Sequence, residues 1–318
     1  MNDITIKEFS IEDKEGSIEL LKTTFPGASN EETFKWRYES YEKLKPLIII
    51  AKSGEKVVSF VSWMPWVFNY EDKQLIGYQA CEGATATEFR NKGLFTKMFL
   101  FSEQLAKEMN IDFYFGFPSK MSYGPVYRAG YYPIINFKFA KRYLIPGVKK
   151  NFRLFTESVN FSDDDFFLYD DDKISPVFNQ YYHEWRFQKN PFDYDTIIYE
   201  ENNNKVLFVL RSNKSLRKKY GLIPKKIMIV DFQTTAFFDE LIENAINYLC
   251  NEYKNRASYL TTFFNAQSSR GNLLSRYFKL KTRLESRILC VRPINYNKRN
   301  IILNGKLWDI MPHIVDYY

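Results

Sequence analysis

The sequence predicts an α/β protein built from two copies of one domain, and two observations lead to this prediction. Segments with the alternation of strands and segments with the spacing of amphipathic helices follow one another along the 318 residues. Residues 34–38 read FKWRY, and residues 183–187 read HEWRF. In both places the next two apolar strands follow the tryptophan at the same intervals, 12 and 21 residues. A repeat of this kind indicates a duplicated fold.

The first copy is expected to span residues 1–147. Its predicted elements, in order, are a strand at 4–9, helices at 12–24 and 31–38, strands at 47–51, 57–63 and 74–87, a helix at 94–110, a strand at 111–117, a short helix at 122–129 and a strand at 135–143. Pro146 and Gly147 interrupt this pattern, and we place the domain boundary there.

The second copy, residues 148–318, is expected to contain strands at 226–232, 258–264 and 286–291 and a helix at 237–254. Residues 233–236, QTTA, connect its fourth strand, at 226–232, to its helix without a glycine or a basic residue. A phosphate group would find no cradle there. We therefore predict a degenerate domain that is structural and shapes the substrate side of the cleft.

Bulk properties limit the partners. The net charge of +7 suits an anionic small molecule, and the basic run at 214–226 is expected to be a loop rather than a nucleic-acid site. Three cysteines without a CxxC pair favour a cytoplasmic protein. Neither a signal peptide nor a membrane span is expected. With only two histidines, a histidine-based metal site is not expected, and we predict no metal.

The turn at residues 90–95, RNKGLF, carries the main chemical signal. Gly93 lets the backbone bend tightly just before the predicted helix that begins at Leu94. Several N–H groups then point outward at the start of that helix, and they bind phosphate anions without needing a particular side chain. One strand later, residues 127–131 read YRAGY. The alternative is an ordinary connection between a strand and a helix.

These motifs resemble the acyl-coenzyme A site of the Gcn5-related N-acetyltransferase (GNAT) superfamily, in its tandem-domain type. The resemblance implies two GNAT-like domains, each with a mixed, mostly antiparallel central sheet flanked by helices, and acetyl-coenzyme A as co-substrate. It implies that pantetheine lies between two strands that splay apart. Phe95 departs from the small residue that the family has there. The residues expected to bind acetyl-coenzyme A are Gly83, Thr85, Arg90, Asn91, Lys92, Gly93, Leu94 and Phe95.

Glu82 and Tyr127 are the candidate catalytic residues. An amine with a free pKa of roughly 10 is mostly ammonium at neutral pH, so a base must accept its proton, and Glu82 is the candidate. Alternation puts Glu82 and Ala84 on one face of their strand and Gly83 on the other. The resemblance places Tyr127 near the sulfur of coenzyme A, where its phenol can protonate the departing thiolate. The alternatives are a Glu82 paired with a nearby Lys or Arg, and a Tyr127 that packs beneath the sheet.

The acceptor is expected to be a primary amine of a small molecule. The resemblance suggests an aminoglycoside-like acceptor or an amino sugar, including the nucleotide sugars that feed bacterial cell-surface polysaccharide biosynthesis. A terminal carboxylate on Tyr318 is a second candidate base. Two alternatives stay open: a non-catalytic acyl-coenzyme A-binding protein, and a Fem-type aminoacyltransferase, against which the turn argues. The acyl group is acetyl or a longer chain, and edge strands with exposed aromatic side chains can support a homodimer. For Trp36 and Arg37, core packing and a structural ion pair are the favoured roles. The residues considered for the acceptor pocket are Trp36, Arg37, Tyr38, Trp63, Trp66 and Tyr123.

Overall fold

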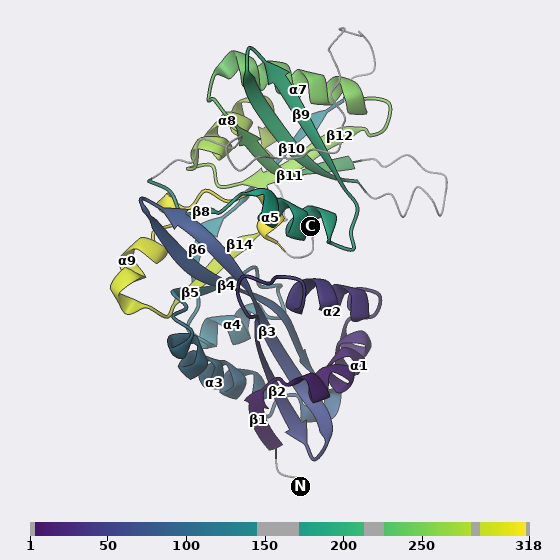
Figure 1. Ribbon diagram of the computed structural model, residues 1–318, viewed down its shortest axis with the longest axis vertical. Helices are drawn as coiled ribbons and strands as arrows, with labels where there is room; N and C mark the ends of the chain where they lie inside the picture. The colour runs from purple at the N-terminus through teal and green to yellow at the C-terminus, as the bar shows by residue number, and fades with distance from the viewer. Residues whose placement is uncertain (1–3, 145–171, 213–225, 281–286, 316–318) are drawn as a thin grey trace.

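The computed structural model describes residues 4–144, 172–212, 226–280 and 287–315, and these form two sheets with helices on their faces (Figure 1). The first sheet has eight strands in the order β1-β2-β3-β4-β5-β14-β6, with β8 paired to β3. Only the pair β4 and β5 is parallel. Its strands are β1 (Ile4–Glu8), β2 (Leu47–Ser53), β3 (Lys56–Tyr70), β4 (Lys73–Thr85), β5 (Phe113–Gly116), β6 (Tyr132–Asn136), β8 (Ser175–Pro176) and β14 (Ile288–Pro293).

The second sheet has six strands in the order β13-β7-β12-β11-β10-β9. It too has one parallel pair, β11 and β12. The prediction of mixed, mostly antiparallel sheets is confirmed. The strands are β7 (Lys138–Tyr143), β9 (Tyr194–Glu201), β10 (Asn204–Ser212), β11 (Lys226–Thr234), β12 (Tyr259–Phe264) and β13 (Lys279–Leu280).

The two halves of the chain exchange strands: the first sheet contains β8 and β14 of the second half, and the second sheet contains β7 of the first half. Two of these strands, β7 and β14, were predicted in the wrong sheet. The strand predicted at 135–143 is two strands: β6 stays in the first sheet, and β7 pairs with β12 in the second. The final strand, β14, lies between β5 and β6 of the first sheet instead of closing the second. Alternation identifies strands but not their partners, because pairing between distant segments leaves no local pattern. The predicted boundary at 147 lies outside the described residues.

Helices cover both faces of the first sheet (Figure 1). Helices α1 and α2 pack on the face of Ile48, Phe60 and Ala84, while α3 packs on the opposite face against Val61 and Trp63. Helix α2 begins at a capping box in which Asn30 accepts a hydrogen bond from the Thr33 N–H. The helices of this half are η1 (Ile11–Asp13), α1 (Lys14–Thr24), α2 (Glu31–Tyr38), η2 (Thr87–Phe89), α3 (Leu94–Glu108) and α4 (Tyr123–Arg128).

The second half carries its own helices, among which α7 and α8 are the longest in the part that the structure describes. Helix α7 buries Leu241, Ile242 and Leu249 in a core with β9, β10 and β11. The helices are α5 (Gln180–His183), the π-helical turn η4 (Glu184–Gln188), α7 (Asp239–Tyr253), α8 (Ser269–Tyr277), η5 (Tyr296–Lys298), α9 (Arg299–Ile302), η6 (Gly305–Leu307) and η7 (Pro312–Ile314).

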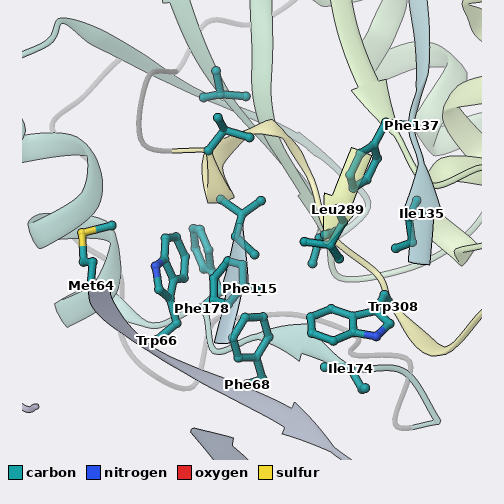
Figure 2. Close-up of a cluster of buried hydrophobic side chains, with 14 of the residues drawn as sticks. Met64, Trp66, Phe68, Phe115, Ile135, Phe137, Ile174, Phe178, Leu289 and Trp308 are labelled. Atoms are coloured by element: carbon teal, nitrogen blue, oxygen red, sulfur yellow. The ribbon is translucent and has the colours of Figure 1, made fainter. Parts of the chain in front are cut away.

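A large aromatic core lies between the two halves. Figure 2 shows Trp66, Phe68 and Phe115 of the first sheet facing Trp308 and Phe178 from the second half of the chain. Trp308 is fully buried against Phe68 and Phe113 at 5.6 and 5.3 Å between ring centroids. Burial of such rings is the dominant stabilising term at a contact of this kind.

The tryptophans of the repeated motif meet in this core. The rings of Trp36 and Trp185 stack with centroids 5.9 Å apart. Each indole N–H donates to the backbone oxygen of the other tryptophan, at 2.9 Å from Trp36 and 3.4 Å from Trp185. This reciprocal pair is what two related copies produce when they face each other. The prediction that Trp36 serves core packing is confirmed.

We predict that residues 1–147 alone do not form a stable domain. Without β14 the fragment leaves an edge of β5 and an edge of β6 unpaired, and it exposes the aromatic core that the second half covers. Circular dichroism should show no cooperative thermal transition for the fragment, whereas the full chain should show one. A sharp transition in the isolated fragment would contradict the exchange of strands.

Candidate active site

Strand β4 pairs with β5 only briefly, so among the described residues the rest of this edge of β4 has no neighbouring strand; we call it the open edge. β5 ends at Gly116, and Pro118 follows, which cannot donate a backbone hydrogen bond. β4 continues to Thr85. The predicted splay between the two strands is therefore present, and it exposes the last residues of β4. The parallel pairs are Gly77 with Phe113, Tyr78 with Tyr114 and Gln79 with Phe115.

The backbone of Gly83 and Thr85 faces this open edge. The Ala86 N–H donates to the oxygen of Val58 in β3 at 2.9 Å, so Ala86 and Val58 form a hydrogen-bonded pair of the antiparallel ladder. Opposite residues of antiparallel strands alternate between hydrogen-bonded and non-hydrogen-bonded pairs. The N–H and C=O groups of Ala84 therefore also point to β3, whereas those of Gly83 and Thr85 point away from it. Strand β4 therefore presents peptide groups to the gap.

The predicted turn before α3 contains two residues in the left-handed conformation. Asn91 has φ of 62° and Gly93 has φ of 72°, both left-handed. Gly93 is the N-cap of α3, and the Lys97 N–H donates to its oxygen at 3.1 Å. The N–H groups of residues 94–96 precede this bond, so the helix itself offers them no partner. A Cβ at Gly93 would have no atom within 4 Å, so the turn opens to space.

Phe95 does not block the turn. Its ring packs against the ring of Phe99 at 4.5 Å between centroids, and a Cβ at Gly83 would lie 3.1 Å from it. The side chain therefore points to β4, and Gly83 has no side chain because Phe95 occupies that space. The absence of a side chain at Gly83 thus makes room for Phe95, which stands where the GNAT motif has a small residue.

The charges around the turn are favourable for an anion. The Arg90 Nε donates to the Thr85 oxygen at 3.0 Å, which holds the turn against the end of β4. The Lys92 ammonium lies 4.7 Å from the ring centroid of Phe89. The first turn of α3 contains no acidic residue. The cationic side chains of Arg90 and Lys92 and the positive end of the helix dipole at the start of α3 therefore both attract an anion.

Glu82 lies on the opposite face of β4, as the alternation predicted, and it is only 4% exposed. Arg37 donates to it at 3.0 Å and the Tyr38 hydroxyl at 2.9 Å, and Ser29 also hydrogen-bonds to it. This geometry favours the alternative of a carboxylate paired with an arginine, and it confirms the structural ion pair expected of Arg37. A catalytic role for Glu82 stays a prediction.

The sequence analysis missed two residues of this cluster, Ser29 and Ser62. The Ser62 hydroxyl contacts the Tyr38 hydroxyl at 2.6 Å and accepts from the Glu82 N–H at 3.2 Å. It fills a bulge in which two residues of β4 oppose one of β3. A serine inside an apolar strand was a usable signal for Ser62. Ser29 approaches from a loop 53 positions away, and no local pattern marks it.

Tyr127 stands at the end of α4 and is 61% exposed. Its ring is nearly parallel to that of Tyr123, with centroids 6.5 Å apart. Gly130 has φ of 83° and ends the helix tightly, as predicted. The alternative of a tyrosine packed beneath the sheet does not fit this exposure. Its role as an acid stays a prediction.

The six residues considered for an acceptor pocket do not gather in one place. Trp63 is fully buried on the face of α3, where its indole N–H donates to the Tyr131 hydroxyl at 3.1 Å, and Tyr123 packs on that same core. Trp66 and Trp36 instead join the core between the two halves. These side chains point to opposite faces of the sheet, so they cannot line one cavity.

The equivalent place in the second sheet is closed. β11 pairs with β12 over three residues and then diverges, but Arg270 fills the gap and donates to the Phe232 oxygen at 3.1 Å. The same guanidinium contacts Asp231 at 3.4 Å and Asp309 at 2.8 Å. α7 begins with Asp239 and an acidic neighbour, which repel phosphate.

Some expectations fall outside the described residues, among them Tyr318 and most of the basic run at 214–226. Within the described ranges, no helix is long and apolar enough to cross a membrane. In the same ranges, no group of three or more His, Cys, Asp or Glu side chains could hold a metal ion. The three cysteines all lie in the described ranges, and none of them forms a disulfide.

Comparison with known proteins supports the fold. A family model described as an acetyltransferase (GNAT) domain matches residues 5–134, from β1 into β6. This stretch includes the open edge of β4 and the turn before α3. No curated protein sequence matches the chain.

Solved structures resemble both halves together. A probable N-acyltransferase from Enterococcus faecalis V583 has a TM-score of 0.64 at 11% identity, over 92% of this chain and 72% of that one. A GCN5-related N-acetyltransferase from Anabaena variabilis ATCC 29413 has a TM-score of 0.62 at 10% identity, over 92% and 73%. Eis1 from Mycobacterium abscessus has a TM-score of 0.57 at 10% identity, over 92% and 74%. At these identities the likeness shows the fold.

We predict that Glu82→Gln destabilises the protein strongly. The substitution removes the carboxylate charge that lies 3.0 Å from the buried Arg37 guanidinium, and breaking a buried ion pair costs about 3–5 kcal/mol in the free energy of unfolding. Urea titration measures this change. The matched control is Glu88→Gln, whose partner Lys56 is exposed, and it should leave the midpoint nearly unchanged. Equal midpoints for the two variants would show that the buried pair has no structural role.

Proposed function

We propose that the chain is a member of the GNAT acetyltransferase superfamily, and that its N-terminal domain, where the GNAT model matches residues 5–134, transfers an acetyl group from acetyl-coenzyme A to a primary amine. The observation that carries the proposal is the open edge of β4 beside the left-handed turn at Gly93. Both present unpaired backbone N–H groups toward one region. A phosphate-bearing thioester needs donors at both places.

The proposed roles follow from position. The N–H groups of residues 94–96, with Arg90 and Lys92 nearby, bind the pyrophosphate. The peptide groups of Gly83 and Thr85 bind the pantetheine amides and stabilise the oxyanion that develops when the amine attacks the thioester. Positioning of this kind supplies much of the rate enhancement. The acetyl group is the expected cargo, because no feature of the described residues calls for a longer chain.

Proton transfers fall to two side chains. As the amine nitrogen bonds to the carbonyl carbon and the carbon–sulfur bond breaks, Tyr127 donates its proton to the leaving thiolate. Glu82 is the proposed acceptor of the amine proton. Since it is buried, the proton reaches it through a hydroxyl that contacts it, and Ser29 and Tyr38 are the two available.

The acceptor that we propose is an amino sugar or an aminoglycoside-like amine. The support is the likeness of the tandem fold to N-acetyltransferases. The net charge of +7 is compatible with an anionic nucleotide sugar as the acceptor. A cytoplasmic location, a role in polysaccharide biosynthesis and a homodimer stay predictions from the sequence.

Both carboxylate oxygens of Glu82 already accept hydrogen bonds, from Arg37 and Tyr38, which disfavours a role as a base. This favours a second candidate function, a protein that binds acyl-coenzyme A without turnover. The two differ in one measurement. An enzyme releases coenzyme A in the presence of a suitable amine, whereas a binding protein holds acetyl-coenzyme A and releases none across a panel of amino sugars.

Calorimetric titration with acetyl-coenzyme A tests the cofactor site. Wild type should bind with a dissociation constant in the micromolar range, and Gly93→Trp should weaken binding at least tenfold, because a side chain there covers the N–H groups. Gly54→Trp is the matched control, since Gly54 also has positive φ, at 60°, and open space around it. Absence of binding to wild type, or an equal loss in both variants, would contradict the proposal.

Tyr127→Phe tests the acid. It should lower kcat by about 100-fold, within the usual range for general acid catalysis, while leaving the affinity for acetyl-coenzyme A unchanged. Tyr132→Phe removes another exposed phenol and should leave kcat as it is. Steady-state assays of coenzyme A release measure both. An unchanged kcat in Tyr127→Phe would remove this residue from the mechanism.

A further inference from the structure

Arg292 joins the second half of the chain to the two helices that border the candidate site. It belongs to β14, where it pairs with Tyr114 of β5. Cys290, two residues earlier in β14, packs in the core beneath α3, and alternation along a strand places Arg292 on that same face of the sheet. The Arg292 side chain is only 13% exposed, so its guanidinium is largely withdrawn from solvent.

The guanidinium contacts α3 on one side and the end of α4 on the other. Its Nη2 donates to Glu103 of α3, whose second carboxylate oxygen lies 3.4 Å from the Lys107 ammonium. Its Nε and Cζ lie 3.6 and 3.9 Å from the position that a Cβ would take at Gly130, two residues after α4 ends. The Glu103 pair therefore fixes a flat cation against the turn that follows α4.

This turn is connected directly to Tyr127. The Gly130 N–H donates to the Tyr127 oxygen at 3.0 Å, and the Tyr131 N–H donates to the Val126 oxygen at 3.4 Å. Gly130 has φ of 83°, which lets both bonds close the end of α4. A displacement of Gly130 therefore moves the backbone that carries the Tyr127 side chain.

The position of the Tyr127 phenol depends on that backbone. In the described ranges its hydroxyl has no hydrogen-bond partner, and its ring is 61% exposed and stacks only with Tyr123. α4 has six residues, which is too few for a helix to be stable by itself. Contacts with the rest of the protein must therefore hold α4 in place, and the buried Tyr131 and Arg292 supply them at its end.

We infer that Arg292 is a positioning residue for the transfer reaction and that it acts through Gly130 on Tyr127. The inference rests on the proposed function, in which Tyr127 protonates the departing thiolate. A displacement of about 1 Å in such a group lowers the rate substantially, because proton transfer requires hydrogen-bond distance. The second half of the chain then contributes to catalysis in the first half, although the gap in its own sheet is filled.

A double-mutant cycle tests this inference. Arg292→Met removes both contacts of the guanidinium and should lower kcat about tenfold, while the dissociation constant for acetyl-coenzyme A stays within about twofold. In a Tyr127→Phe background the same substitution should leave kcat unchanged, because the group that it positions is absent. An equal loss in both backgrounds would indicate a purely structural arginine and would overturn the inference.

The matched control is Arg299→Met, which removes an exposed arginine of α9 and should leave kcat unchanged in both backgrounds. Arg292→Lys keeps a cation beside Glu103 but withdraws the flat guanidinium from Gly130. It should lower kcat about threefold in the wild-type background alone, and it keeps the cycle decisive if Arg292→Met fails to fold.

Amide hydrogen exchange provides a readout that needs no turnover. In Arg292→Met, a peptide that covers residues 122–131 should exchange at least about fivefold faster than in wild type, whereas a peptide over β2 should exchange as before. Unchanged exchange over 122–131 would overturn the inference. If wild type releases no coenzyme A with any amine, the proposed function fails and the role of Arg292 in transfer fails with it, while the exchange data still decide whether Arg292 holds α4.

Discussion

The exchange of β7 and β14 between the two sheets is the constraint on which the rest of the structure depends. β14 pairs with β5 on one side and β6 on the other, so the first sheet is incomplete without the end of the chain. From β14, Arg292 reaches α3 through an ion pair with Glu103 and packs beside Gly130. The second half of the chain therefore fixes β5, α3 and the exit of α4, which together border the candidate site.

The two copies share a gap between parallel strands but differ in what fills it. In the first copy the gap stays open, and a glycine turn without acidic residues precedes the helix. In the second, Arg270 bridges Asp231 and Asp309 inside the gap, and Asp239 opens the helix. A buried arginine with two carboxylates is costly to disrupt. This difference between the copies supports the proposal that only the first copy binds the cofactor, whereas the second covers the core around Trp185.

Local signals in the sequence predicted most of the fold. The predicted helix at 31–38 coincides with α2, and Gly93 marked the turn because few other residues adopt its φ. The strand exchange escaped prediction because hydrogen bonding between distant strands leaves no periodicity. Contacts of Glu82 with Ser29 and Arg37 were equally hidden, since they join a strand to a loop and a helix.

Amide hydrogen exchange with and without coenzyme A tests the central claim, that backbone groups of the first copy alone hold the cofactor. Peptides that cover residues 82–97 should become protected on binding, because the N–H groups of β4 and of the start of α3 then donate to the ligand. Peptides over the equivalent residues 231–242 should exchange as before. Protection confined to the second segment, or binding without protection in the first, would contradict the account.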